Sequence, residues 1–270
     1  MLASALGVAT FLWLHLRRAQ NELTRLERAQ LVLDTELRIA AELQQSLLPP
    51  LPAARGGWRF AADLEPAGKV GGDFYLDRGD SLLLLLADVS GKGIPAAVAM
   101  GSCRTIFREL ARDTEDLARL VARLSQALLE EHGGAPYLTC ILARLDLAAR
   151  SVSWVNAGHP AGVVVARGAH RPLAATGPPA GLLSGAGYEA GTLRLIPGEA
   201  LVLVTDGVSE GLDGDDRVEE RLARAIASPR ARGAQAICDQ LMRLARAGRE
   251  RVLSGIPQDD RTVVVVTLEA

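Results

Sequence analysis

The chain has 270 residues, 49% of them hydrophobic and 23% charged, which suffices for one domain of ordinary size plus an appendage. Its formal net charge of −2 and the lack of a long basic run argue against nucleic acid as a partner. The cysteines Cys103, Cys140 and Cys238 are widely spaced in apolar or helical stretches, which predicts buried thiols in a reducing compartment, not a disulfide frame or a zinc site.

Residues 2–16 form an apolar stretch that is followed at once by Arg17-Arg18. The stretch is shorter than the roughly 20 residues of a spanning helix. A cleaved signal peptide is not expected, because no basic residues precede the stretch. We interpret residues 1–16 as an apolar N-terminal segment that forms a short membrane anchor. The paired arginines would then hold the chain that follows in the cytoplasm, tethered to the inner face of the membrane. The alternative is an amphipathic or buried helix.

Residues 17–49 are predicted to form a long helical, coiled-coil-like linker, because the stretch up to residue 47 has no Gly or Pro and is rich in Leu, Glu, Gln, Arg and Ala. Two rows at heptad spacing form a seam with two polar interruptions, Leu26, Leu33, Ala40 and Leu47 in one row and Leu23, Gln30, Leu37 and Gln44 in the other. This favours a homodimer, with a passive stalk as the alternative. Pro49-Pro50 ends the helix, and residues 50–270 form the predicted catalytic domain.

The stretch from Leu82 to Gly93 is the centre of this domain. Six apolar residues in a row predict a strand that is buried on both faces and carries Asp88 at its tip. Gly91 and Gly93 then allow a tight turn, and Ile94-Pro95 begins a helix whose first turn leaves backbone N–H groups and Lys92 beside the acid. This pattern is typical of a functional site.

Three further acidic positions stand beside possible strands, and three of the four positions in all abut an apolar strand. Asp73 precedes Phe74-Tyr75, Asp206 ends the run Leu201–Thr205, and Asp259-Asp260 stand just before Thr262–Val266. Side by side in adjacent strands, such acids would form a pocket of oxygen ligands, which Mg²⁺ and Mn²⁺ prefer. Each acid alone is explained equally well as a turn or cap residue.

The order of the remaining elements predicts stacked sheets covered by helices, not a doubly wound parallel sheet. We expect strands near 58–63, 70–77, 82–88, 137–146, 151–156, 161–166, 190–195, 200–205 and 261–268, and helices near 94–112, 114–132, 216–227 and 233–248. Residues 156–160, Asn-Ala-Gly-His-Pro, are interpreted as a hairpin turn, with His159 as a general acid the alternative. Ser90 has no His and acid at recognisable triad positions, so it is interpreted as a turn residue.

Five motifs in this order resemble those of the metal-dependent PPM-type (type 2C) serine/threonine phosphatases, in particular the stage II sporulation E branch. They are residues 71–75, 88–93, 156–160, 205–210 and 259–262, and the resemblance extends from about Ala41 to Leu268. It implies an α/β fold, a four-layer α-β-β-α sandwich preceded by the long helix. It also implies two Mn²⁺ or Mg²⁺ ions that activate a water. The implied substrate is a phosphoserine or phosphothreonine on a regulatory protein, an anti-sigma-factor antagonist.

The resemblance also implies roles for individual residues. Asp88 would bridge both ions and the carbonyl of Val89 would complete one shell. Asp206 and Asp259 would hold one ion, and Asp73 would reach the other directly or through water. The residues Asp260, Lys92, Gly91 and His159 would support the ligands or the phosphate, although Lys92 is equally well explained as a solvated loop residue.

Two positions depart from the family pattern. Leu76 stands where an acid often follows Phe-Tyr, with Asp77 one place later, and a phosphate-binding arginine has no evident counterpart, although Arg104 could take that role. The alternative function is a catalytically weak or dead sensor or scaffold that acts as a membrane-tethered dimeric module. Loss of Asp88 or Asp206 would have favoured it, and both residues are present.

Overall fold

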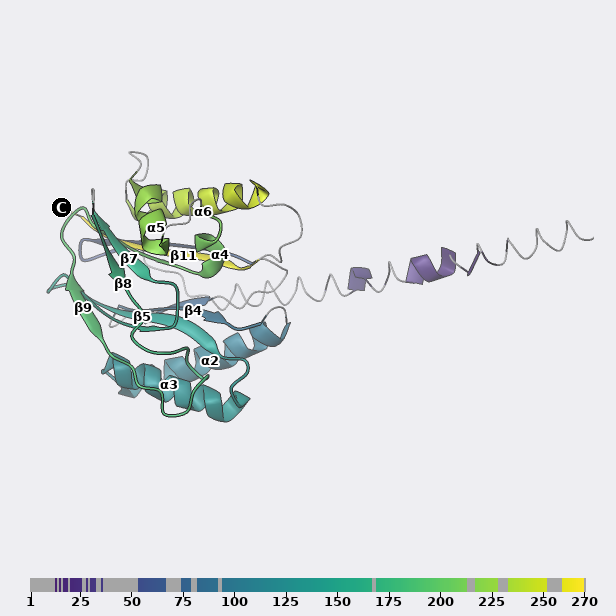
Figure 1. The fold of residues 1–270 in the computed structure, drawn as a ribbon, viewed down its shortest axis with the longest axis horizontal. Coiled ribbons are helices and arrows are strands. Elements are labelled where there is room, and N and C mark those ends of the chain that lie inside the picture. Colours follow the sequence, from purple (N-terminus) through teal and green to yellow (C-terminus); the bar gives the residue numbers. More distant parts are fainter. Residues whose placement is uncertain are drawn as a thin grey trace, which may run out of the picture.

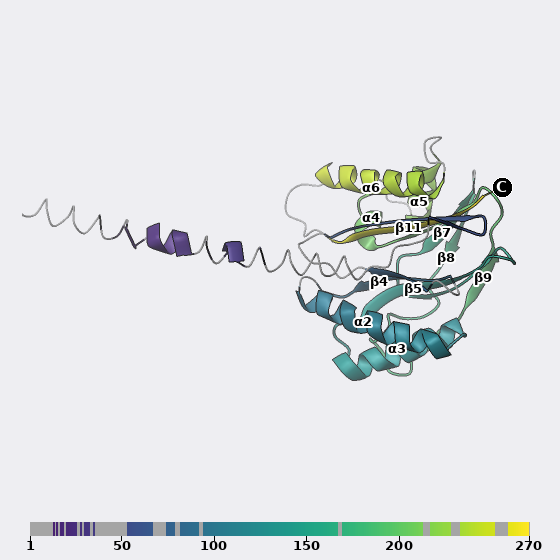
Figure 2. The same ribbon diagram turned by 180° about the vertical axis from the view of Figure 1, so that it is seen from behind.

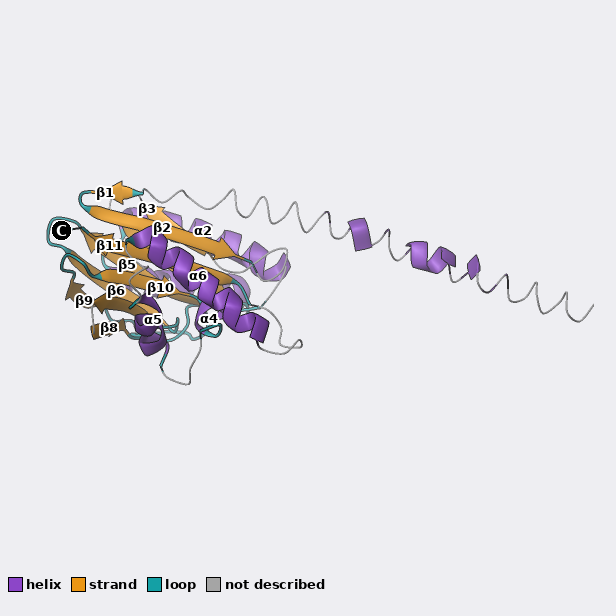
Figure 3. Ribbon diagram, turned by 90° about the horizontal axis from the view of Figure 1, so that it is seen from above, coloured by secondary structure: helices purple, strands orange, loops and turns teal. Residues whose placement is uncertain are grey.

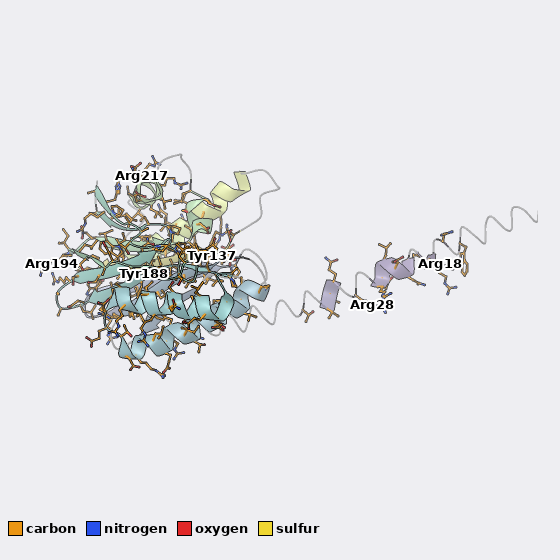
Figure 4. The ribbon with its side chains drawn as sticks, turned by 60° about the horizontal axis from the view of Figure 1, so that its bottom comes forward. Arg18, Arg28, Tyr137, Tyr188, Arg194 and Arg217 are labelled. Atoms are coloured by element: carbon orange, nitrogen blue, oxygen red, sulfur yellow. The ribbon has the colours of Figure 1, made fainter. Side chains whose placement is uncertain are left out.

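The computed structural model describes residues 53–66, 74–78, 82–91, 94–166, 169–212, 217–227, 233–251 and 259–269, with scattered positions between 13 and 35. Those scattered positions are helical and exposed, which agrees with a helix in this part of the chain. Figure 4 shows Arg18 and Arg28 among them. Most of the predicted anchor and of the heptad seam lies outside the described residues, as do Asp73 and Lys92. Within the described part, no helix combines the length and hydropathy that a membrane crossing requires.

Two antiparallel sheets form the centre of the domain. The first, here called sheet 1, has the strand order β3 (Phe74–Arg78), β4 (Leu83–Val89), β5 (Leu138–Asp146), β6 (Ser151–Ala157) and β9 (Gly191–Arg194). The second, sheet 2, has the order β1 (Ala54–Arg55), β2 (Trp58–Glu65), β11 (Arg261–Leu268), β10 (Ala200–Val204), β7 (Gly162–Ala166) and β8 (Ala169–Leu173).

Helices cover the outer face of each sheet (Figures 1 and 2). Sheet 1 is covered by α2 (Ile94–Asp113) and α3 (Leu117–His132), and sheet 2 by α4 (Asp206–Ser209), α5 (Val218–Ile226) and α6 (Ala234–Arg251). The ends of α3 follow the usual rules, since Asp116 accepts a hydrogen bond from the N–H of Arg119 and Gly133 ends the helix in the left-handed conformation. The layers are therefore α-β-β-α, and the predicted fold class is confirmed.

The run of leucines in β4 is explained by burial on both faces. Leu83, Leu85 and Ala87 pack in the core under α2 and α3, whereas Leu84 and Leu86 pack in the core between the sheets. Successive side chains of a strand point to opposite faces, so a strand in an inner layer needs apolar residues at every position. The sequence-based prediction for this strand is confirmed.

The predicted hairpin at residues 156–160 is wrong. β6 belongs to sheet 1, where β5 and β9 are its neighbours, whereas β7 pairs with β10 and β8 in sheet 2. The segment therefore crosses from one sheet to the other. Gly158 has a φ of +68° and packs against Pro179, and the side chain of Asn156 accepts a hydrogen bond from the N–H of His159 and donates one to the carbonyl of Leu173.

The other predicted elements of the domain are present with small shifts of their bounds, while β1, β8 and α4 were not predicted. The three cysteines are buried and free, as predicted. Burial is the main cause that raises the pKa of each thiol to about 12.

Candidate active site

Asp88 lies near the end of β4, directly across from Thr139 in β5. Because Leu84 and Leu86 face sheet 2, the alternation of the strand places Asp88 on that same face. The chain after it is held to β5 by two hydrogen bonds of 2.9 Å, from the N–H of Ser90 to the carbonyl of Tyr137 and from the N–H of Tyr137 to Ser90 Oγ. Tyr137 is labelled in Figure 4. Ser90 is thus a turn residue, as predicted, and Gly91 continues the turn at a φ of +101°.

Asp206 begins α4 at the end of β10, and its neighbour Thr205 connects β10 to β11. The N–H of Thr205 donates to the carbonyl of Thr262 at 3.1 Å, and the N–H of Thr262 donates to Thr205 Oγ1 at 2.9 Å. The hydroxyl of Thr205 also donates to the carbonyl of Asp260 at 3.2 Å. This buried threonine therefore ties the segment that carries Asp206 to the segment that carries Asp259 and Asp260.

The two segments also touch through their backbones. A Cβ added at Gly207 would lie 2.1 Å from the carbonyl oxygen of Asp260 and 3.0 Å from that of Asp259, so no residue with a side chain fits there without a shift. Within the pair, Oδ1 of Asp259 accepts a hydrogen bond of 3.1 Å from the N–H of Asp260. The segment of Asp206 and the segment of Asp259 and Asp260 are therefore in backbone contact.

His159 connects the two sheets at the end where these acids lie. Its ring is buried, with Nδ1 2.9 Å from the hydroxyl of Thr139, the residue across from Asp88. Burial lowers the pKa of His159 to about 3, and the backbone of Val204, two residues before Asp206, offsets part of this effect. Nε2 makes no hydrogen bond of normal geometry among the described residues. The neutral ring thus lies between the strand ends that carry Asp88 and Asp206.

The residues of the site suit a hard divalent cation by chemistry, since they offer carboxylate oxygens and a backbone carbonyl. Asp88 and Val89 lie in β4 of sheet 1, whereas Asp206 follows β10 and Asp259 and Asp260 precede β11, both strands of sheet 2. Within the described residues, no three His, Cys, Asp or Glu side chains gather closely enough to hold a metal ion. Asp73, the other predicted ligand, lies outside this part, but the strand that follows it pairs Phe74 with Ala87, next to Asp88. The ligand set remains a prediction.

Several residues of the site were not found from the sequence. Thr205 and Gly207 belong to the motif at residues 205–210, but no role was predicted for either of them, and Thr139 carries no local signal at all. Arg104, the suggested phosphate ligand, lies on α2, where burial and the neighbouring charge of Arg108 lower its pKa. Its proposed role stays a prediction.

Solved protein structures share this fold, among them the following two. The SiaA-PP2C domain of Pseudomonas aeruginosa is 21% identical, with a TM-score of 0.73 over 89% of this chain and 99% of that domain. The catalytic domain of the serine/threonine phosphatase PstP, solved with two manganese ions, is 17% identical, with a TM-score of 0.60 over 79% of this chain and 99% of that one. The architecture is therefore that of the PP2C, or PPM-type, phosphatases.

The sequence narrows this class further. A family model described as stage II sporulation protein E matches residues 78–269, and the chain belongs to that family. A curated relative, the phosphoserine phosphatase RsbU of Bacillus subtilis, is 26% identical over 196 residues, which are 71% of this chain and 58% of RsbU. The chain spans between 32% and 58% of the length of the curated relatives it matches.

Proposed function

We propose that this protein is a metal-dependent phosphoprotein phosphatase that hydrolyses phosphoserine or phosphothreonine on a regulatory protein. The observation that carries the proposal is the tie between the segment of Asp206 and that of Asp259 and Asp260 through Thr205. Buried His159 lies against Thr139, the residue across from Asp88. RsbU, a phosphoserine phosphatase by name, supports the substrate class. From the resemblance to the sporulation branch, we propose an anti-sigma-factor antagonist as the substrate.

The cofactors we propose are two Mn²⁺ or Mg²⁺ ions, supported by the manganese ions of PstP and by the carboxylate donors present here. When bound, such ions supply a nucleophile at neutral pH and neutralise the charge of the phosphoryl group. Asp88 and the carbonyl of Val89 would hold them from sheet 1. Asp206 and Asp259 would hold them from sheet 2, and Asp73 would add a further ligand.

The residues around the acids have supporting tasks in this proposal. Ser90 is assigned to the turn, where its oxygen accepts the N–H of Tyr137, and not to the nucleophile, since it has no His and acid at recognisable triad positions. His159 does not act as a general acid at neutral pH, because burial lowers its pKa to about 3 and keeps it neutral. Its ring instead sets the separation of the two strand ends, while Thr205 fixes Asp206 beside Asp259 and Asp260.

The N-terminal segment has its own proposed role. We propose that the helix at 17–49 dimerises through Leu23, Leu26, Leu33 and Leu37, and that residues 2–16 tether the catalytic domain to the inner face of the membrane. In the described part of this segment, Leu23 of the seam is exposed, which leaves apolar surface for a partner helix. The join at residues 41–50 would then transmit the arrangement of the helices to the catalytic domain.

The test is turnover of an aryl phosphate and of a phosphoserine protein by the purified chain, with added Mn²⁺ or Mg²⁺ and with a chelator. We expect no turnover with the chelator, nor in Asp88→Asn or Asp206→Asn, while far-ultraviolet circular dichroism stays unchanged. An amide offers one weak oxygen where a carboxylate offers two charged ones. Asp113→Asn, an exposed acid at the end of α2, is the matched control. Full turnover in the chelator or in either active-site variant would refute the proposal.

A further inference from the structure

The C-terminal half of α6 touches the segment that follows Asp206. A Cβ added at Gly248 would lie 1.8 Å from the carbonyl oxygen of Gly211, and one added at Gly211 would lie 2.6 Å from the carbonyl oxygen of Ala245. Real Cβ contacts are essentially never shorter than 3.0 Å, so the two backbones can approach this closely only because both positions are glycine. The turn at Gly211 is thus seated directly on α6.

This turn is rigidly connected to Asp206. The N–H of Glu210 donates to the carbonyl of Asp206 at 2.7 Å, and the N–H of Gly211 donates to the carbonyl of Val208 at 3.1 Å. Hydrogen bonds of this kind continue the helical path from α4 into the turn. A shift of Gly211 relative to α6 would therefore be carried to the start of α4, where Asp206 lies.

The same half of α6 is linked through Glu65 of β2 to Arg261, the residue that follows Asp260. Figure 3 shows α6 lying over β2 and β11. Arg261, the first residue of β11, directly follows Asp260 and pairs across the strands with Glu65, the last residue of β2. Glu65 Oε1 accepts a hydrogen bond of 2.7 Å from Arg261, and Oε2 accepts one of 2.6 Å from Nε of Arg246 on α6.

This ion-pair network differs from an exposed surface pair in the burial of its side chains. The side chain of Arg261 is 8% exposed and that of Glu65 is 33% exposed, so the first pair is largely shielded from water. Loss of the Glu65 charge would leave a buried guanidinium without this partner, which is costly. An exposed pair such as Arg112 and Glu109 on α2 has no such consequence.

We propose that the C-terminal half of α6 is a positioning element for the metal site, which seats the segment after Asp206 through Gly248 and the segment after Asp260 through Arg246 and Glu65. The residues named do not touch the reacting atoms. They set the spacing of the acids of sheet 2 from outside the site. The inference rests on the proposed function, because it assumes that these acids bind metal.

The expected effect is a loss of metal affinity beyond any loss of stability. Changes to groups that orient metal ligands typically lower metal affinity by about 10- to 100-fold. We therefore expect Glu65→Gln and Gly248→Ala each to weaken Mn²⁺ binding by roughly 10-fold. Arg246→Gln removes only the exposed half of the network and should have a smaller effect.

The experiment measures Mn²⁺ binding to the full chain by titration calorimetry, the rise in Tm on adding Mn²⁺, and turnover of an aryl phosphate across a Mn²⁺ titration. Two control variants make changes of the same kind as Glu65→Gln and Gly248→Ala at positions away from α6. Arg112→Gln removes an exposed ion pair on α2, and Gly101→Ala adds a methyl group to a helical glycine with nothing within 4 Å. Both controls should bind Mn²⁺ like the wild type. Excess Mn²⁺ should restore most of the turnover of Glu65→Gln.

The wild type tests the proposed function, and the variants test the role of α6 separately. If the wild type binds no Mn²⁺ and shows no turnover, the proposed function fails. If the wild type binds Mn²⁺, and Glu65→Gln and Gly248→Ala have a lower Tm but the same Mn²⁺ affinity as the controls, α6 has a merely structural role and the inference is overturned. Should Gly248→Ala not fold, the comparison of Glu65→Gln with Arg112→Gln decides.

Discussion

Replacement of Gly207 by alanine tests whether the acid-bearing segments of sheet 2 are in backbone contact. The added Cβ would lie 2.1 Å from the carbonyl oxygen of Asp260, whereas an ordinary contact is 3.4 Å or longer. The neighbouring atom belongs to the backbone, so it cannot move away by a change of rotamer. Either α4 or the start of β11 must shift by about 1 Å or more.

The size of the effect follows from this shift. Overpacking of this kind typically costs about 1–3 kcal/mol. In a domain of this size, each kcal/mol lowers Tm by roughly 2–4 °C, so we expect Gly207→Ala to lower Tm by about 2–12 °C. A misplacement of about 1 Å near the reacting groups can cost about 100-fold in rate, and we expect a loss of that order in turnover.

The assay combines thermal unfolding, followed by circular dichroism, with metal-dependent turnover of an aryl phosphate. The control is Gly101→Ala on α2, where the new methyl group meets nothing within 4 Å. That control should leave turnover unchanged and Tm unchanged or slightly higher, since alanine reduces the entropy of the unfolded chain. If Gly207→Ala matched this control in both Tm and turnover, the segments of Asp206 and Asp260 would not be in contact, and the geometry argued for the site would be wrong.

Three further predictions concern other parts of the chain. Ser90→Ala should lower stability by about 0.5–1.5 kcal/mol through the lost hydrogen bond to Tyr137, yet keep a substantial fraction of turnover; a covalent phosphate trapped on Ser90 would contradict this. Burial lowers the pKa of His159 in the folded chain to about 3, whereas the ordinary pKa of about 6.5 applies in the unfolded chain. As pH falls below about 6.5, the unfolded chain therefore binds a proton at His159 that the folded chain does not bind, and the free energy of unfolding decreases. The urea midpoint of the metal-free protein should therefore fall with pH in this window more steeply for the wild type than for His159→Gln, and equal slopes would refute the assignment. Leu33→Asn should reduce self-association in sedimentation measurements, and an unchanged oligomeric state would exclude the heptad seam.

The sequence by itself determined most of the elements and their order, although β1, β8 and α4 were not predicted. A run of apolar residues such as Leu82–Ala87 predicts an inner strand, because every position of such a strand must be buried. An acid that follows such a run therefore lies at the end of the strand. The glycines and prolines around Asp88 marked the turn and the start of α2 in the same local way. These properties depend on neighbours in the chain, so they can be read from the chain alone.

Only the tertiary structure decided which strands pair and which side chains meet. The residues between β6 and β7 have the composition of a hairpin turn, but a turn looks the same in sequence whether the next strand pairs with the last one or crosses to the other sheet. The place of His159 between Thr139 and Val204 follows from that crossing. Contacts between positions far apart in the chain, such as Glu65 with Arg261, leave no periodic signal, because they arise from the packing of whole layers.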